Sequence, residues 1–287
     1  QLQKGLFGQL VVQPRGATVT YPVAGTRMTA NVTAPALAQQ QSILSADTLP
    51  ATTAQTYRDF SLVWQKMMNY RYASGNAVQN ESEEGPGLPE NPPHTLLSAA
   101  NYRAEPTFFR FGIPPLAAAG NAHCGLQFSA PKAANPADAT CFGSVLNAGS
   151  LFSNALTNGD PVTPIFVATA GQQFRIGLTN PNSSNRGTTF TLHGHVWPRD
   201  PYLALNRNAA GFPNNANIGN VGSVVIGNNP LQFYLGAQES IIGSAHYVIK
   251  PTTGAGGGDA VTGDYLMRDT SAAGMGGGAW GILRVVP

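Results

Sequence analysis

Short segments in which apolar and polar residues alternate fill the second half of the chain, each bounded by residues that favour turns. Alternation with a period of two places one set of side chains on a single face of a β-strand. No segment has the apolar spacing of an amphipathic helix. We therefore expect an all-β fold, an antiparallel sandwich of about seven to nine strands. The pattern predicts strands over 57–65, 164–169, 173–179, 188–197, 231–235, 240–250 and 263–268.

The two ends of the chain resemble each other. Gly5-Leu-Phe-Gly-Gln-Leu-Val-Val-Gln-Pro14 and Gly278-Ala-Trp-Gly-Ile-Leu-Arg-Val-Val-Pro287 share Gly, an aromatic residue, Gly, Leu, Val and Pro in register. This repeat predicts that each segment is the last strand of a repeated domain. An isolated terminal strand cannot fold alone, so we expect the rest of the first domain to come from a polypeptide outside this sequence.

The segments between these ends have compositions typical of loops. Residues 15–55 are rich in Thr, Ala and Gln with almost no charge, which predicts a linker or an irregular crossing segment. The polar, Pro-containing stretch 71–105 predicts a long loop, and Gly254–Gly258 predicts a flexible turn. We expect residues 1–14 to be the terminal strand of a preceding domain, 15–55 a linker, and 56–287 a second domain with loop insertions.

Composition narrows the class of protein. Only 10% of the 287 residues are charged and the net charge is +2, too small to indicate binding to nucleic acid or to an anionic membrane. No apolar stretch approaches the ~20 residues that span a bilayer. The 33 glycines and 22 prolines suit a sandwich with many turns.

The two cysteines, Cys124 and Cys141, lie in one polar, Pro- and Ala-rich loop. We predict that they form a disulfide, because such a loop cannot hold itself by hydrophobic burial. That prediction places the protein in an oxidising, extracytoplasmic compartment: secreted, periplasmic or at the cell surface. Two free thiols are the alternative. The absence of an initiator Met before Gln1 suggests a processed product.

His193 and His195 are the best candidates for chemistry. Residues two apart on a strand point to the same face, so two imidazoles there could bind one metal or two neighbouring metals. Copper has the highest affinity for nitrogen ligands among the common divalent ions. The alternative is two ordinary histidines with hydrogen-bonded rings.

The surrounding motifs resemble the multicopper oxidase family. Thr189-Phe-Thr-Leu-His-Gly-His-Val-Trp197 is similar to a His-containing strand of that family, and 159–180 to the strand pair before it. Residues 263–269 with 278–286 are similar to its domain-closing block, and 3–12 to the same block of a preceding cupredoxin domain. The closest resemblance is to large bacterial multi-domain members. It implies a Greek-key cupredoxin-like β-sandwich, copper as the cofactor, and electron transfer from a reducing substrate to dioxygen.

The chain departs from the family at several ligand positions. The closing block of an active domain carries His-x-His or His-Cys-His after its Tyr, and here Met267, Arg268, Asp269 and Thr270 stand there. Arg cannot be deprotonated and cannot bind copper, and no thiolate is available at this place. In the longer family motif Thr188 and Thr191 replace two histidines and only His193 is a ligand. In the shorter motif both His193 and His195 are ligands.

Two functions fit these observations. The first is a copper-binding cupredoxin component of a multicopper-oxidase-like oxidoreductase, with copper held by His193 and His195. Under this hypothesis the missing ligands come from a sister fragment of the same precursor or from another cupredoxin-domain chain. We therefore expect the protein to form a complex with that chain. The second is a non-catalytic structural or assembly subunit whose copper sites have decayed. For the other candidates we expect lesser roles. His94 should lie at the surface, His246 in the core or an interface, and Met275 should serve in packing. Three carboxylates could orient a ligating histidine: Glu105, Asp200 and Asp269.

Overall fold

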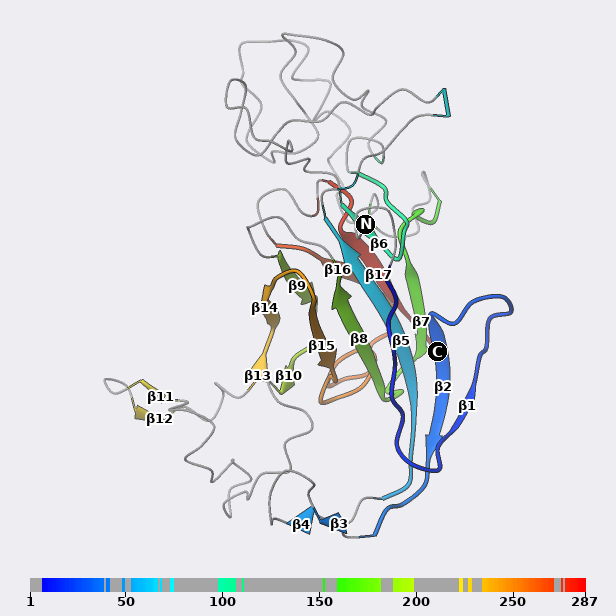
Figure 1. Cartoon of the computed structure of the whole chain (residues 1–287), viewed down its shortest axis with the longest axis vertical. Coiled ribbons are helices and arrows are strands. Elements are labelled where there is room, and N and C mark those ends of the chain that lie inside the picture. The colour runs from blue at the N-terminus through cyan, green and yellow to red at the C-terminus, as the bar shows by residue number, and fades with distance from the viewer. Residues whose placement is uncertain are drawn as a thin grey trace.

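The computed structural model contains two β-sheets that pack face to face (Figure 1). The all-β sandwich predicted from the alternating pattern is confirmed. Among the described residues, no helix is long and apolar enough to cross a membrane. The described residues are 7–38, 40–41, 48–49, 53–66, 68, 73–74, 98–106, 110, 152, 159–181, 188–198, 222–223, 227–228, 234–270, 275 and 277–287.

The first sheet is built around β5, whose eleven residues make it the longest described strand. Its neighbours are β2, antiparallel, and β8, parallel. The order is β1 (Thr18–Thr20), β2 (Thr29–Ala34), β5 (Gln55–Gln65), β8 (Phe174–Asn180) and β15 (Ala245–Ile249), and β6 (Ala99–Ala100) pairs with the end of β5.

The second sheet holds the C-terminal strand in its interior. β17 pairs with β16 antiparallel and with β7 parallel. The order is β14 (Ala237–Ile241), β9 (Thr188–Leu192), β16 (Gly263–Arg268), β17 (Trp280–Val286) and β7 (Ile165–Thr169). The expected antiparallel arrangement therefore has two parallel exceptions, each between strands joined by a long stretch of chain rather than a hairpin.

Short ribbons complete the described strands. They pair β10 (Trp197–Pro198) with β13 (Tyr234–Leu235), β11 (Gly222–Ser223) with β12 (Gly227–Asn228), and β3 (Gln40–Gln41) with β4 (Thr48–Leu49).

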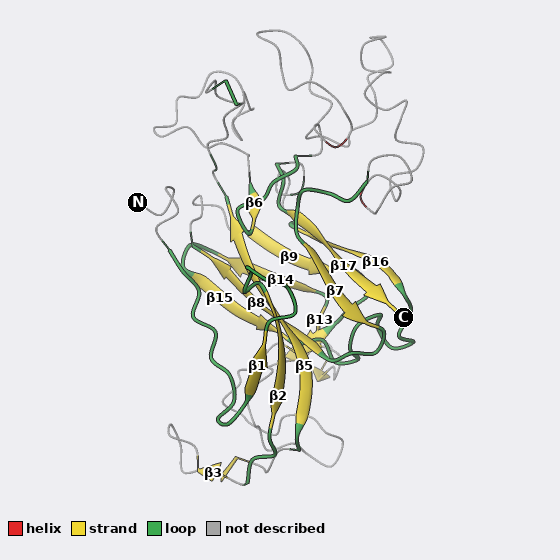
Figure 2. Cartoon of the chain, turned by 90° about the vertical axis from the view of Figure 1, so that its right-hand side faces the viewer, coloured by secondary structure: helices red, strands yellow, loops and turns green. Residues whose placement is uncertain are grey.

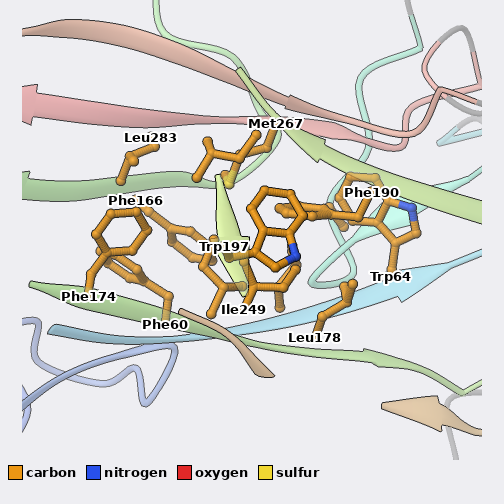
Figure 3. Packing of buried hydrophobic residues seen from close by; sticks show 14 of the residues in the cluster. Phe60, Trp64, Phe166, Phe174, Leu178, Phe190, Trp197, Ile249, Met267 and Leu283 are labelled. Atoms are coloured by element: carbon orange, nitrogen blue, oxygen red, sulfur yellow. The ribbon is translucent and has the colours of Figure 1, made fainter. Parts of the chain in front are cut away.

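A core rich in aromatic side chains fills the space between the sheets (Figure 3). Phe60 of β5 stacks on Phe166 of β7 with ring centroids 4.5 Å apart, so it joins one sheet to the other. Trp64 meets Phe190 edge-on at 5.7 Å. Large, buried aromatic surfaces of this kind contribute much of the burial free energy of a sandwich.

The linker prediction for 15–55 is wrong over 29–34. Those residues form β2, which pairs along its whole length with β5. Ala30, Val32 and Ala34 are buried and alternate with Thr and Asn. Small side chains and threonines concealed this strand, because they carry a weak hydrophobic signal. The division into domains remains a prediction.

One further strand prediction needs correction. Residues 240–250 form two strands, β14 and β15, separated by a turn at Gly243–Ser244. Residues 7–14, the described part of the segment predicted to be a terminal strand, run extended and pair with no described strand, so their role as a strand of another domain stays a prediction. In contrast, the strands predicted over 57–65, 164–169, 173–179 and 263–268 all coincide closely with β5, β7, β8 and β16.

Candidate metal site

The strand predicted over 188–197 is interrupted at the histidine pair. β9 ends at Leu192, and His193 and Gly194 form a turn. Gly194 has a φ of 72°, and a Cβ there would lie 3.0 Å from the Tyr265 ring. Glycine is needed at this place because other residues rarely adopt that conformation. The two imidazoles therefore do not share a strand face: His193 is exposed, while His195 is only 4% exposed.

Both ring nitrogens of His195 have backbone partners. The Gly256 N–H donates to Nε2 across 3.2 Å, so Nε2 is an acceptor and Nδ1 carries the proton. Nδ1 then donates to the His193 carbonyl across 2.8 Å. Burial lowers the pKa of His195, partly opposed by that backbone hydrogen bond, and keeps the ring neutral. A metal could bind this ring only by displacing one of the two hydrogen bonds.

Aromatic rings fix the orientation of His195. The rings of Phe174 and Tyr265 meet the imidazole edge-on, with centroids 5.6 Å and 4.9 Å away. The Tyr265 hydroxyl in turn donates to the Val261 carbonyl across 2.8 Å. The ring is thus packed as a core side chain whose polar atoms are satisfied.

The turn predicted at Gly254–Gly258 is confirmed, and it is packed in the interior rather than exposed. Residues 254–257 are buried, and Ala255 forms two backbone hydrogen bonds with the turn after β7, to Gly171 and Gln172. A Cβ at Gly254 would lie 2.6 Å from the Gly171 carbonyl oxygen. These glycines allow close approach of two backbones, which brings the Gly256 N–H to His195.

His193 lies at the surface with a cation beside it. Its backbone N–H donates to the Leu266 carbonyl across 3.0 Å, which continues the pairing with β16. The Nε of Arg268 donates to His193 Nε2 across 3.2 Å, and Arg268 also reaches the Met275 sulfur at 3.9 Å. Partial burial and the charge of Arg268 both lower the pKa of His193. Among the described residues, Nδ1 of His193 has no partner.

The positions that align with the family's ligands do meet in space, because β9 and β16 are neighbours. Met267 pairs with Leu192 and is buried in the core, and Arg268 pairs with Thr191. The next residue, Asp269, is fully buried.

A buried ion pair occupies this junction. The Lys66 ammonium lies 3.1 Å from Asp269 Oδ2, with the two side chains 8% and 0% exposed. Asp269 also accepts hydrogen bonds from the Thr188 hydroxyl and from the Thr189 N–H and hydroxyl. Pairing of this kind is what a buried carboxylate requires.

The described residues do not fit a copper ion at these positions. The side chains present there are a guanidinium, a carboxylate already paired with an ammonium, hydroxyls and the thioether of Met267. Only the thioether is a group that copper prefers, and Met267 is buried in the hydrophobic core. Across the part of the chain that is described, no three His, Cys, Asp or Glu side chains gather in a geometry that could hold a metal. The prediction that His193 and His195 bind copper stays a prediction.

The other candidates are distributed as follows. Glu105 pairs with Arg110 at 3.4 Å and accepts from the Val162 N–H, so it does not orient a histidine. Met275 is buried and packs near Trp280 and Ile282. His246 is exposed on β15. His94, Cys124, Cys141 and Asp200 lie outside the described residues, and so does the predicted disulfide.

Sequence reasoning missed Lys66 and the buried pair of Asp59 and Arg175. The Arg175 guanidinium donates to both carboxylate oxygens of Asp59, at 2.9 Å and 2.8 Å. A signal was available: in a chain with so few charges, charged residues inside the apolar strands β5 and β8 point to buried pairs.

No protein-family model and no curated protein matches the chain. Among solved structures, it is similar to a multicopper oxidase at 10% identity and a TM-score of 0.32, over 79% of this chain and 44% of that one. It is also similar, at 17% identity and a TM-score of 0.24, to dithionite-reduced auracyanin from Roseiflexus castenholzii and to auracyanin B. Those two matches each cover 43% of this chain and 84% and 77% of the respective auracyanin. At such low scores these likenesses carry no argument about function.

Proposed function

We propose that this chain is a cupredoxin-like component of a multicopper-oxidase-like oxidoreductase, and that its described residues have a structural rather than a catalytic role. Copper in such an assembly is held by residues of a partner polypeptide. The resemblance of the motifs to the family supports the proposed assembly. The side chains at the aligned ligand positions support a structural role for this chain.

One observation carries the structural role. At the junction of β9 and β16, the positions aligned with family ligands hold Arg268 and the buried pair of Asp269 with Lys66. Positive groups at these positions oppose a copper ion, and the ion pair itself ties β5 to the second sheet. The ion pair thereby contributes to holding the two sheets together.

Metal analysis tests this role. The full chain is incubated with Cu(II), desalted and measured for copper per polypeptide, together with the His193→Ala variant. We expect copper far below one ion per chain and no difference between the two proteins. One copper per chain that disappears in His193→Ala would overturn the proposal.

A second candidate function is a half-site for copper shared with a partner. His193 favours it, because the ring is exposed, its lowered pKa favours the neutral form, and Nδ1 is unpartnered among the described residues. Neutral imidazole is the form that binds metals. In this case the isolated chain binds no copper, but the His193→Ala substitution removes copper from the purified complex.

We also propose an extracytoplasmic location, which rests on the predicted disulfide between Cys124 and Cys141. Peptide mapping by mass spectrometry without reduction tests it. A linked Cys124–Cys141 peptide in the native protein is expected, and alkylation of both free thiols would contradict the location.

A further inference from the structure

The first described residues, 7–14, form an extended segment that we call the N-terminal strap. It runs along the outer face of the first sheet, beside β8 and β15 (Figure 2). Alternate side chains are half-buried against that sheet, and the Gln9 amide donates to the Gly177 carbonyl across 2.8 Å. At its start, Phe7 stacks on Tyr102 with ring centroids 5.3 Å apart.

Gln13 anchors the other end of the strap. Its side-chain oxygen accepts from the Arg175 guanidinium at 2.7 Å and from the Tyr57 hydroxyl at 2.8 Å. Its amide nitrogen donates to Asp59. Every polar atom of the Gln13 side chain is therefore engaged with the buried charge pair, so one side of the strap is firmly bound to this domain.

The opposite side of the strap is bare and apolar. Leu10 is 89% exposed and Val12 is 74% exposed, the two highest values among the exposed large apolar side chains described. Within the described part of the chain, no backbone group of residues 8–13 bonds to another backbone group. The Val12 carbonyl accepts a hydrogen bond from the Arg175 guanidinium at 3.3 Å. An extended segment whose backbone groups bond to no other backbone and which carries exposed apolar residues is a template for strand pairing.

The strap's counterpart in the repeat shows what such a strand does when its partners are present. In the register of the repeat, Leu10 aligns with Leu283 and Val12 with Val285, both on β17. Leu283 is 0% exposed and Val285 is 3% exposed, in the core between the sheets. β17 is paired on both edges, antiparallel to β16 and parallel to β7.

We propose that the N-terminal strap is the closing strand of a second β-sandwich domain that has no closing strand of its own. Leu10 and Val12 enter the core of that domain, and the backbone of the strap pairs with two of its strands, as β17 pairs with β16 and β7. The half-buried side of the strap, fixed through Gln13, then lies between the two domains.

The occupant is not a second copy of this chain. The slot that would accept the strap is already filled in each copy by its own β17. The partner must have two unpaired strand edges, one equivalent to that of β16 and one equivalent to that of β7, with space for a strand between them. The side chains below that space must be apolar. A sandwich of this same architecture without its last strand meets those requirements.

This inference deepens the partner part of the proposed function and does not depend on copper. Its failure and the failure of the copper proposal are separate outcomes, since one is read from crosslinks and the other from metal content.

Site-specific photocrosslinking in the native complex tests the inference. A photoreactive phenylalanine analogue replaces Leu10 or Val12, and Tyr21, an exposed residue outside the strap, serves as the matched control position. We expect crosslinks from positions 10 and 12 to apolar residues of a β-sandwich domain, mapped by mass spectrometry, and none to that domain from position 21. Crosslinks to another copy of this chain, to its own outer sheet, or to nothing would overturn the proposal.

A substitution provides the second readout. The double variant Leu10→Asp with Val12→Asp is expected to lose the partner domain completely in size-exclusion chromatography. Its melting temperature as an isolated chain should equal that of the wild type, because both side chains are exposed. Retention of the partner by this variant would also contradict the proposal, and Tyr21→Asp is the control that should keep it.

Discussion

His193 and His195 are separated by one glycine, yet they lie in physically different surroundings. His195 is enclosed by aromatic rings, and both its nitrogens are bonded to backbone groups. His193 is at the surface, with one nitrogen next to a guanidinium. Gly194 causes the difference, because its positive φ turns the chain and sends the two rings in different directions.

This comparison shows that a His-x-His motif is not sufficient for a metal site. Two histidines in one motif can differ in role: one is a buried, hydrogen-bonded side chain and the other is exposed to solvent. The backbone conformation of the residue between them decides this difference. The positions on β9 and β16 that align with family ligands also show that a motif alone does not define a metal site. There the carboxylate of Asp269 pairs with the Lys66 ammonium. Four variants and conditions sharpen the contrast.

The largest effect is expected from Asp269→Ala. Removing the carboxylate deprives the buried Lys66 ammonium of the opposite charge of Asp269, so the free energy of unfolding should fall by about 3–5 kcal/mol. Urea denaturation measures this change. Asp160→Ala is the matched control, because Asp160 is 47% exposed and Arg284 keeps Asp264 as a second partner. Its expected cost is below about 1 kcal/mol, and equal costs for the two variants would refute the buried-pair interpretation.

His195→Ala comes next. The substitution leaves the Gly256 N–H without an acceptor and opens a cavity between Phe174 and Tyr265, for an expected loss of about 2–4 kcal/mol. His193→Ala at the exposed position should change stability by less than about 0.5 kcal/mol. Similar losses in the two variants would mean that the two rings are not in the different environments described above.

Gly256→Ala tests the turn that supplies the N–H to His195. Its φ of 88° and a Cβ contact of 2.6 Å with Val261 predict a loss of at least about 1–3 kcal/mol. Gly258→Ala, where no atom lies within 4 Å of a new Cβ, is the control and should be close to neutral. If the Gly256→Ala protein were as stable as this control, the turn would not be packed as tightly as described, and the prediction of a flexible turn would be supported.

The smallest effect is the pH dependence. Both histidines have folded-state pKa values lowered from 6.5, so below pH 6.5 the unfolded chain binds more protons than the folded chain. Stability should therefore fall as the pH drops from 6.5 to 5, by at most about 1.4 kcal/mol per pH unit for the buried His195. The exposed His193, which is screened by solvent, should contribute much less. In His195→Gln this slope should be smaller, measured by thermal melts at a series of pH values. An unchanged slope would show that His195 is not buried in its neutral form.

Local patterns in the sequence were enough to predict most of the fold. Strands with a clear period of two, such as β5, β8 and β16, were found almost to the residue. β2 was missed because Thr and Ala carry little hydrophobic signal. The strap was expected to be a strand, but a strand is defined by its hydrogen-bonded neighbours, and no described strand pairs with residues 7–14.

The candidate site was only partly predictable for a related reason. The histidine pair and the substituted ligand positions are visible as motifs. The role of Lys66 is not, because it meets Asp269 across about 200 residues of sequence and only through the packing of the two sheets. The tautomer of His195 depends likewise on Gly256, which reaches it from a turn whose glycines alone suggested flexibility.

The most direct test of the structural role of His195 is NMR of the full chain with 15N-labelled histidine. Long-range proton–nitrogen correlations report which ring nitrogen carries the proton. We predict a neutral His195 ring protonated at Nδ1 at pH 7, with signals that persist when Cu(II) is added. A ring protonated at Nε2, or His195 signals that broaden selectively with substoichiometric Cu(II), would contradict the account and return His195 to the set of copper ligands.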